Sequence, residues 1–237
     1  MRLLVVDFDY FFPVPQDPGH PEAHLYAWGH FETPYYLQDV WEARAWAFLL
    51  RGLPLPQAQG WEGFWERFRF APEAQLFYAD SNALAFHPRV RAGVEEVVLF
   101  DAHHDAGYRS LGEEPACDDW MVFYARQGAR LTLYYPPWRD PSLEPEPQVP
   151  VVRLLDPGGK VEGVFHRAFL CRSGAWVPPW ADGAFFRFLE AAPLSREALE
   201  PLSPRPFDLK ALKRRVEEEA LGLWILEALR GHGPRPR

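Results

Sequence analysis

Residues 97–105 read Val97-Val98-Leu99-Phe100-Asp101-Ala102-His103-His104-Asp105. Four consecutive apolar residues predict a buried strand of a parallel sheet, and the acids and histidines follow at its carboxyl end. If the segment stays extended, Asp101, His103 and Asp105 point to one side and His104 points elsewhere. Buried carboxylates require a metal, another cation or water, and this mixture of oxygen and imidazole donors suits manganese, zinc or iron. The alternative is a polar loop that simply follows a strand.

A second pair of acids follows another apolar run at the start of the chain. Residues 2–6 predict a buried strand, and Asp7 and Asp9 come directly after it on one face. Together the two clusters supply enough candidate ligands for two bridged metal ions with a shared hydroxide, which the metals would make nucleophilic at neutral pH. The candidate ligands are Asp7, Asp9, Asp101, His103 and Asp105.

Strand-like and helix-like segments alternate along the chain. This order predicts an α/β fold of three layers around a mainly parallel sheet, and we expect residues 1–237 to form one domain. Ligand chemistry in such sheets gathers beyond the carboxyl ends of the strands, where both acid clusters fall. Residues 138–150 are expected to form a surface connection. The expected strands are 2–6, 75–78, 97–100, 131–135, 151–155 and 164–171, and the expected helices are 38–50, 61–70, 181–191 and about 208–230.

Composition and charge limit the classes of function. The chain has 237 residues, of which 48% are hydrophobic and 24% charged, and these values are typical of a folded globular protein. A net charge of −8 without a broad basic surface argues against nucleic acid as a partner. Two cysteines give neither a disulfide framework nor a cysteine-rich zinc site. Because there is no signal-peptide pattern and no apolar run of about 20 residues, we expect a cytoplasmic protein without membrane contact. These features do not predict an oligomeric state.

Several motifs make the chain similar to known metalloenzymes. The segment 101–105 resembles the Asp-Ala-His-x-Asp motif of the arginase and histone-deacetylase superfamily. The closest resemblance is to an arginase-like family of mostly uncharacterised proteins that includes peptide arginases. Residues 6–12 are similar to the Asp-Leu-Asp-Phe-Phe signature of that family, and residues 118–121 stand where it has Gly-Asn-Trp-Leu. Residues 169–173, followed by 178–182, resemble its late strand, Ser-Pro loop and helix.

The resemblance implies an arginase/deacetylase-like fold with a divalent metal as cofactor. Manganese is the first expectation and zinc the alternative, with one or two ions. Asp101 would bridge two ions, His103 would bind one of them and Asp105 the other. Asp7 would be a bridging ligand and Asp9 a terminal one. In ordinary arginases the Asp-x-Asp pair comes late in the chain, so the connectivity here would be permuted.

The chain departs from the superfamily pattern before the central motif. Dinuclear members usually have an early histidine ligand, whereas residues 78–83 of this chain contain none. Asp80 could be a substitute ligand, Asn82 is a further possibility, and His87 lies farther along the chain. One metal position could therefore be altered or empty, and a single ion would shift the analogy towards the deacetylases.

Further residues have candidate roles in catalysis or substrate binding. Asp105 would orient the nucleophile, and a histidine near the site, His104 or His30, would protonate the leaving amine. Asp118 and Asp119 replace Gly-Asn of the family and could favour a cationic guanidinium or amine. Arg172 and Ser173 follow a strand and could contact substrate. For His30 the alternative is a polar surface loop.

Three functions remain open from the sequence. The first is a metal-dependent hydrolase that cleaves a C–N bond, of guanidino or amide type, in a small molecule or peptide. The second is a non-catalytic protein of the same fold that binds a metal or a partner. The third is a phosphatase of the haloacid-dehalogenase type, with Asp7 as nucleophile and Asp9 as acid, although Phe11 stands where that pattern has Thr or Val.

Overall fold

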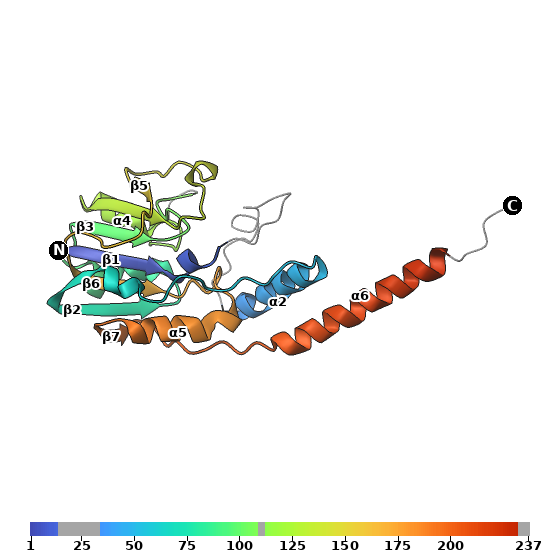
Figure 1. Cartoon of the computed structure of the whole chain (residues 1–237). Helices are drawn as coiled ribbons and strands as arrows, with labels where there is room; N and C mark the ends of the chain where they lie inside the picture. The colour runs from blue at the N-terminus through green and yellow to red at the C-terminus, as the bar shows by residue number, and fades with distance from the viewer. Residues whose placement is uncertain (14–33, 109–111, 232–237) are drawn as a thin grey trace.

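A computed structural model describes residues 1–13, 34–108 and 112–231. Its centre is a seven-stranded sheet with the order β5-β4-β3-β1-β6-β2-β7 (Figure 1). All neighbouring strands pair in parallel, and the central strands β1 and β3 are buried over nearly their whole length, as is typical of parallel sheets. The strands are β1 (Arg2–Asp7), β2 (Arg69–Ala79), β3 (Glu96–Phe100), β4 (Arg130–Tyr135), β5 (Val152–Leu155), β6 (Val164–Cys171) and β7 (Ser195–Ala198).

The order of the strands makes β1 a topological switch point. From β1 the chain continues to β2 on one side of the sheet and then returns to β3 on the other. Val6 of β1 lies in register with Phe100 of β3, and Asp7 lies in register with Cys171 of β6. Three strands therefore end at the same level, and ligand sites of open α/β sheets form at such a place.

Helices cover both faces of the sheet, and alternate side chains of β1 pack into the cores on the two faces. Leu4 and Val6 belong to a core cluster with helix α5 (Asp182–Ala191). Leu3 and Val5 belong to a second cluster on the opposite face with α4 (Trp120–Arg126). The predicted α/β class with a parallel sheet is thereby confirmed. The other helices are α2 (Pro34–Leu50), α3 (Pro88–Arg91) and α6 (Leu209–Gly231), with 3₁₀ turns η1 (Phe8–Phe11), η2 (Phe64–Arg67), η3 (Asn82–Phe86), η4 (Pro141–Leu143) and η5 (Pro179–Ala181).

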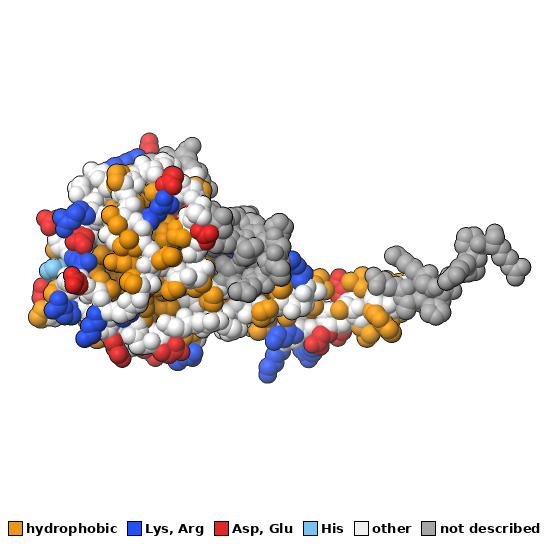
Figure 2. Space-filling view, turned by 45° about the horizontal axis from the view of Figure 1, so that its top comes forward, with side chains coloured by type: hydrophobic (Ala, Val, Ile, Leu, Met, Phe, Trp, Pro, Cys, Tyr) orange, Lys and Arg blue, Asp and Glu red, His pale blue; other side chains and the backbone are white. Residues whose placement is uncertain are grey.

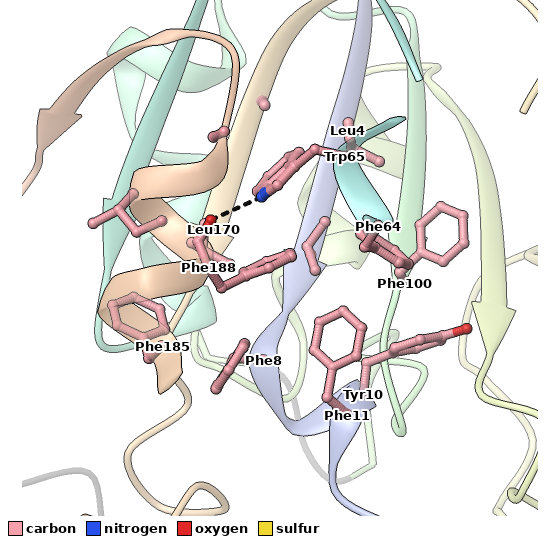
Figure 3. Close-up of a cluster of buried hydrophobic side chains, with 14 of the residues drawn as sticks. Leu4, Phe8, Tyr10, Phe11, Phe64, Trp65, Phe100, Leu170, Phe185 and Phe188 are labelled. Atoms are coloured by element: carbon pink, nitrogen blue, oxygen red, sulfur yellow. Dashed lines mark hydrogen bonds between the residues drawn. The ribbon is translucent and has the colours of Figure 1, made fainter. Parts of the chain in front are cut away.

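Aromatic side chains dominate the core beneath α5 (Figure 3). The ring of Phe188 stacks on Trp65 at a centroid distance of 4.8 Å, and Trp65 Nε1 donates a hydrogen bond to the Phe188 carbonyl at 2.9 Å. Phe8, directly after β1, meets Phe185 edge-on at 5.4 Å. This packing anchors the chain just beyond the carboxyl end of β1, where Asp7 and Asp9 lie.

Truncation of Phe188 tests this packing. Phe188 is fully buried and contacts several rings, so Phe188→Ala is expected to lower the free energy of unfolding by about 3–5 kcal/mol. Urea unfolding followed by circular dichroism measures the change. Phe186→Ala is the matched control, because Phe186 lies on the same helix but is only partly buried. Equal losses in the two variants would contradict this account of the core.

Helices α2 and α6 lie beyond the carboxyl ends of the strands and pack against each other (Figure 1). The second half of α6 projects from the body and carries exposed apolar side chains, among them Trp224 with 65% of its surface exposed (Figure 2). Within the described ranges, none of the helices combines the length and apolar character that crossing a membrane requires.

The structure corrects several expectations. The helix expected at 61–70 is wrong: the chain forms only the short turn η2 after Gly63, whose φ is 71°, and β2 begins at Arg69. The aromatic spacing there reflects core packing. Strand β7 and helix α4 were not expected. Residues 138–150 are not purely a surface connection, because Arg139 and Glu144 are buried.

Candidate metal centre

The candidate centre is built at the carboxyl ends of β1 and β3. Asp7 ends β1, and its side chain accepts a hydrogen bond from the backbone N–H of Asp9 at 2.9 Å, which caps the turn η1. Asp101 follows β3 directly, and its Oδ1 accepts the His103 N–H at 2.8 Å. Each strand therefore delivers an acid whose carboxylate also fixes the turn of the chain after the strand.

One group of possible ligands consists of Asp9, Asp101 and His103. Their ligand atoms lie within 4.8 Å of one another, and all three residues are buried. His103 Nδ1 is 2.9 Å from Asp9 Oδ2 and 3.5 Å from Asp101 Oδ1. The backbone N–H of Ala102 donates to Asp9 Oδ1 at 3.3 Å. Two segments that are far apart in sequence thus converge on one point.

A second group consists of Asp7, Asp101 and Asp105, also within 4.8 Å and buried. Asp105 adopts a φ of 47°, an uncommon conformation that Asp tolerates better than most residues. Trp120 Nε1 donates to Asp105 Oδ2 at 2.7 Å. The amide Nδ2 of Asn82 lies 2.7 Å from Asp7 Oδ2, 3.2 Å from Asp101 Oδ2 and 2.9 Å from Asp105 Oδ2. Asp101 belongs to both groups.

Burial and mutual repulsion perturb the acids of this centre. Burial, followed by the charge of Asp9, raises the pKa of Asp7 well above its usual range. Burial and the neighbouring carboxylates raise the pKa of Asp101 in the same way. Burial also raises the pKa of Asp105 to about 7. For His103, burial alone would lower the pKa, but Asp9 and other nearby acids raise it to about 9.

These residues fit a metal ion. Clustered carboxylates in a buried place repel one another, and a cation between them removes the repulsion and the need to hold protons. Carboxylate oxygens with an imidazole nitrogen are a donor set that divalent first-row metals accept.

The candidate ligand Asp80 lies in neither group. Its Oδ1 accepts a hydrogen bond from Arg172 Nε at 2.6 Å. Arg172 Nη1 also pairs with Asp182 at 3.2 Å. Arg172 is thus engaged by two carboxylates, so the roles expected for Asp80 as a ligand and for Arg172 as a substrate contact find no support in these positions.

Ser173, by contrast, lies next to the acids. Its side chain hydrogen-bonds Asp7, and this bond lowers the pKa of Asp7 against the larger effect of burial. Its φ is 59°, and its backbone N–H donates to the Asp80 carbonyl at 2.9 Å. The turn after β6 thereby contributes a hydroxyl to the centre.

His104 points away from the acids, although the segment 101–105 is bent and not extended as the alternation of side chains would require. Its Nδ1 accepts the N–H of Ala106 at 2.9 Å, and its Nε2 lies 3.1 Å from the carbonyl of Pro145. Its ring stacks on Tyr108 at 4.0 Å, and burial lowers its pKa. This neutral, fully engaged imidazole is poorly placed for the proton donor that the sequence suggested.

Asp118 and Asp119 lie apart from the two groups. Both are buried near the start of α4, and Asp119 Oδ1 accepts the N–H of Ala116 at 2.7 Å. Neither belongs to a group that could hold a metal. His30 lies outside the described residues.

Sequence reasoning missed several supporting side chains. Glu144 is buried and accepts the N–H of His104 at 3.0 Å and the hydroxyl groups of Tyr108 and Tyr135. The half-buried Trp176 lies 4.7 Å from the His103 ring. Trp120, which donates to Asp105, was noted in the sequence only as part of the segment 118–121. An isolated Glu in a Pro-rich stretch gave no signal at all.

Comparisons of this protein with protein-family models, curated proteins and solved structures found no match. The fold and the centre together define the chain as a parallel seven-stranded α/β protein with two overlapping groups of buried Asp and His side chains that could hold a metal. Membership of the arginase and deacetylase superfamily stays a prediction from the motifs.

Proposed function

We propose that this protein is a metal-dependent hydrolase that cleaves a C–N bond of guanidino or amide type, as the arginase-like motifs suggest. The observation that carries the proposal is the convergence of Asp9, Asp101 and His103 from two strands to within 4.8 Å. The position agrees with it, because the group lies at the switch point of the sheet.

The donor set favours manganese or zinc over calcium or magnesium, since it includes an imidazole. A bound ion of this kind lowers the pKa of water, so that a nucleophile becomes available near neutral pH. His103 must lose a proton to bind a metal, and its hydrogen bond to Asp9 at 2.9 Å orients the ring towards the acids.

Asp105 is the group that we assign to orient the attacking water and accept its proton. Its carboxylate is held by hydrogen bonds from Trp120 Nε1 at 2.7 Å and Asn82 Nδ2 at 2.9 Å, and a carboxylate fixed beside the possible ligands can act as a general base. His104 is not assigned a catalytic role, because both of its ring nitrogens are engaged by the backbone.

The acidic character of the centre favours a cationic substrate, either a small molecule or a peptide side chain. The carboxylates of Asp7, Asp9, Asp101 and Asp105 are buried together and can pair with a guanidinium or an amine. The phosphatase hypothesis, in which Asp7 would attack phosphorus, is weakened by Phe11, which stands where that pattern has Thr or Val. A cytoplasmic location and the absence of nucleic-acid partners remain part of the proposal.

Metal analysis combined with an activity screen tests the function. The full chain, loaded with Mn²⁺ or Zn²⁺, is offered arginine, agmatine, arginine-containing peptides and acylated amines, and the release of urea or amine is measured. We expect turnover on one of these classes. Loss of a residue that hydrogen-bonds a metal ligand typically costs 10–100-fold in metal affinity or activity. Because His103 is itself a proposed ligand, His103→Ala should lower turnover by about 100-fold or more.

The control is His87→Ala, because His87 lies outside both groups and its side chain caps the helix α3. It should retain activity. Stoichiometric metal binding without turnover on any of these substrates would contradict the proposed hydrolase and support the non-catalytic alternative.

A further inference from the structure

The two groups of possible ligands differ in what lies between their carboxylates. In the group of Asp9, Asp101 and His103, the atoms facing one another are carboxylate oxygens and an imidazole nitrogen. In the group of Asp7, Asp101 and Asp105, a neutral amide from Asn82 reaches all three acids. The second position is therefore already filled by a hydrogen-bond donor.

We infer that the amide of Asn82 takes the place of a second cation, so that the chain binds one divalent ion, between Asp9, Asp101 and His103. This inference rests on the proposed metal-dependent function and specifies the number and position of the ions. The Nδ2 atom lies 2.7, 3.2 and 2.9 Å from the three carboxylates. An ion bound by the same oxygens at about 2.0–2.6 Å would need the space that this nitrogen occupies.

The orientation of the amide supports the same conclusion. The NH₂ end of Asn82, which carries both of the amide's donors, faces the three acids. The Oδ1 end is buried and has no hydrogen-bond partner among the described residues. The side chain thus leaves its own oxygen unsatisfied in order to place its donors between the acids. Binding of an ion in this position would require the reverse orientation, with Oδ1 towards the acids.

The backbone around Asn82 holds the amide in place. Asn82 begins η3, and the preceding Ser81 caps this turn by accepting the N–H of Ala83 at 3.2 Å. The carbonyl of Ala85 in the same turn accepts the Tyr124 hydroxyl at 2.8 Å. Only 3% of the surface of Asn82 is exposed. Displacement of the amide by a second ion would therefore disturb a turn that is anchored on α4.

The test counts ions on the full chain. Purified protein is dialysed against Mn²⁺, its metal content is measured by mass spectrometry, and its EPR spectrum is recorded. We expect one ion per chain and the spectrum of an isolated Mn²⁺. In Asn82→Asp a fourth acid replaces the donor, so we expect two ions and the spectrum of a spin-coupled pair. His166→Ala is the control, because His166 lies in β6 outside both groups of possible ligands, and this variant should still bind one ion.

The outcomes separate this inference from the proposed function. Two ions on the wild-type chain would overturn the inference but leave the hydrolase possible. No ion at all would overturn both. One ion without turnover would support the inference and contradict the hydrolase.

If Asn82→Asp does not fold, anomalous diffraction from Mn²⁺-soaked wild-type crystals decides the question. A single peak beside Asp9 and His103 supports the inference. A peak between Asp7 and Asp105 overturns it.

Discussion

Replacement of Asp101 by Asn is expected to abolish metal binding while the protein stays folded. Asp101 is the residue common to both groups of possible ligands, so no arrangement of one or two ions within these groups avoids it. Loss of a residue that only hydrogen-bonds a metal ligand weakens metal binding 10–100-fold. Loss of Asp101, a ligand itself, should weaken it by about 100-fold or more. Asn has nearly the shape of Asp, and its oxygen can still accept the N–H of His103, which the carboxylate now accepts at 2.8 Å.

The control for this variant is His166→Ala. His166 lies in the first half of β6, where its Nδ1 accepts the backbone N–H of Arg2 at 3.3 Å, and it belongs to neither group. Metal content by mass spectrometry and folding by circular dichroism are measured for both variants. Full metal content in Asp101→Asn would show that the ion, if one binds, is held elsewhere.

The metal-free protein is expected to lose stability as the pH rises from about 4 to 7, the reverse of ordinary acid denaturation. Asp105 has a pKa of about 7 in the folded state against 3.8 unfolded, chiefly because it is buried. In this window the folded state binds more protons than the unfolded state, so stability falls with pH. For Asp105 alone the loss is roughly 4 kcal/mol. Asp7 and Asp101, whose pKa values are also raised, act in the same direction.

His103 extends this decline to higher pH. Its pKa rises from 6.5 to about 9 on folding, so the stability that its proton contributes is complete below 6.5 and is lost as the pH passes 9. Urea unfolding in the presence of a chelator at pH 5, 7 and 9 measures the whole effect. Asp105→Asn should reduce the decline of the free energy of unfolding with pH below pH 7. Saturating Mn²⁺ should remove this decline. A metal-free protein that gains stability between pH 5 and 7 would contradict the clustering of these acids.

The fold could be predicted where one pattern dominates a segment. The runs 3–6 and 97–100 are continuously apolar and short, a pattern typical of buried parallel strands, and both became central strands. The segment 61–70 misled because aromatic residues spaced by three or four suit a helix face and an irregular core segment equally well. Tertiary packing against Phe188 decided the outcome there.

The candidate centre could be predicted from the sequence only for residues that directly follow a recognisable strand. Acids that follow two strands must meet if the strands are neighbours, and Asp9 and Asp101 do meet through His103. The segment 101–105 is bent rather than extended, so the shared direction of its side chains comes from turns and from the unusual φ of Asp105. Asn82 was named only as a possible ligand, and its role as a donor to three acids emerges from the folded chain, as does the buried Glu144, which no sequence pattern indicated.

The position of β1 beside β3 has a consequence for how the chain assembles. His103 and Asp9 are 94 residues apart, so their side chains meet only after the first strand has docked against a partner made much later in the chain. Parallel pairings of this kind close long loops and form slowly. The repulsion among the clustered carboxylates therefore arises late in folding. A nascent or truncated polypeptide that ends before residue 101 cannot assemble the cluster, and capture of an ion would signal that the middle of the sheet is complete.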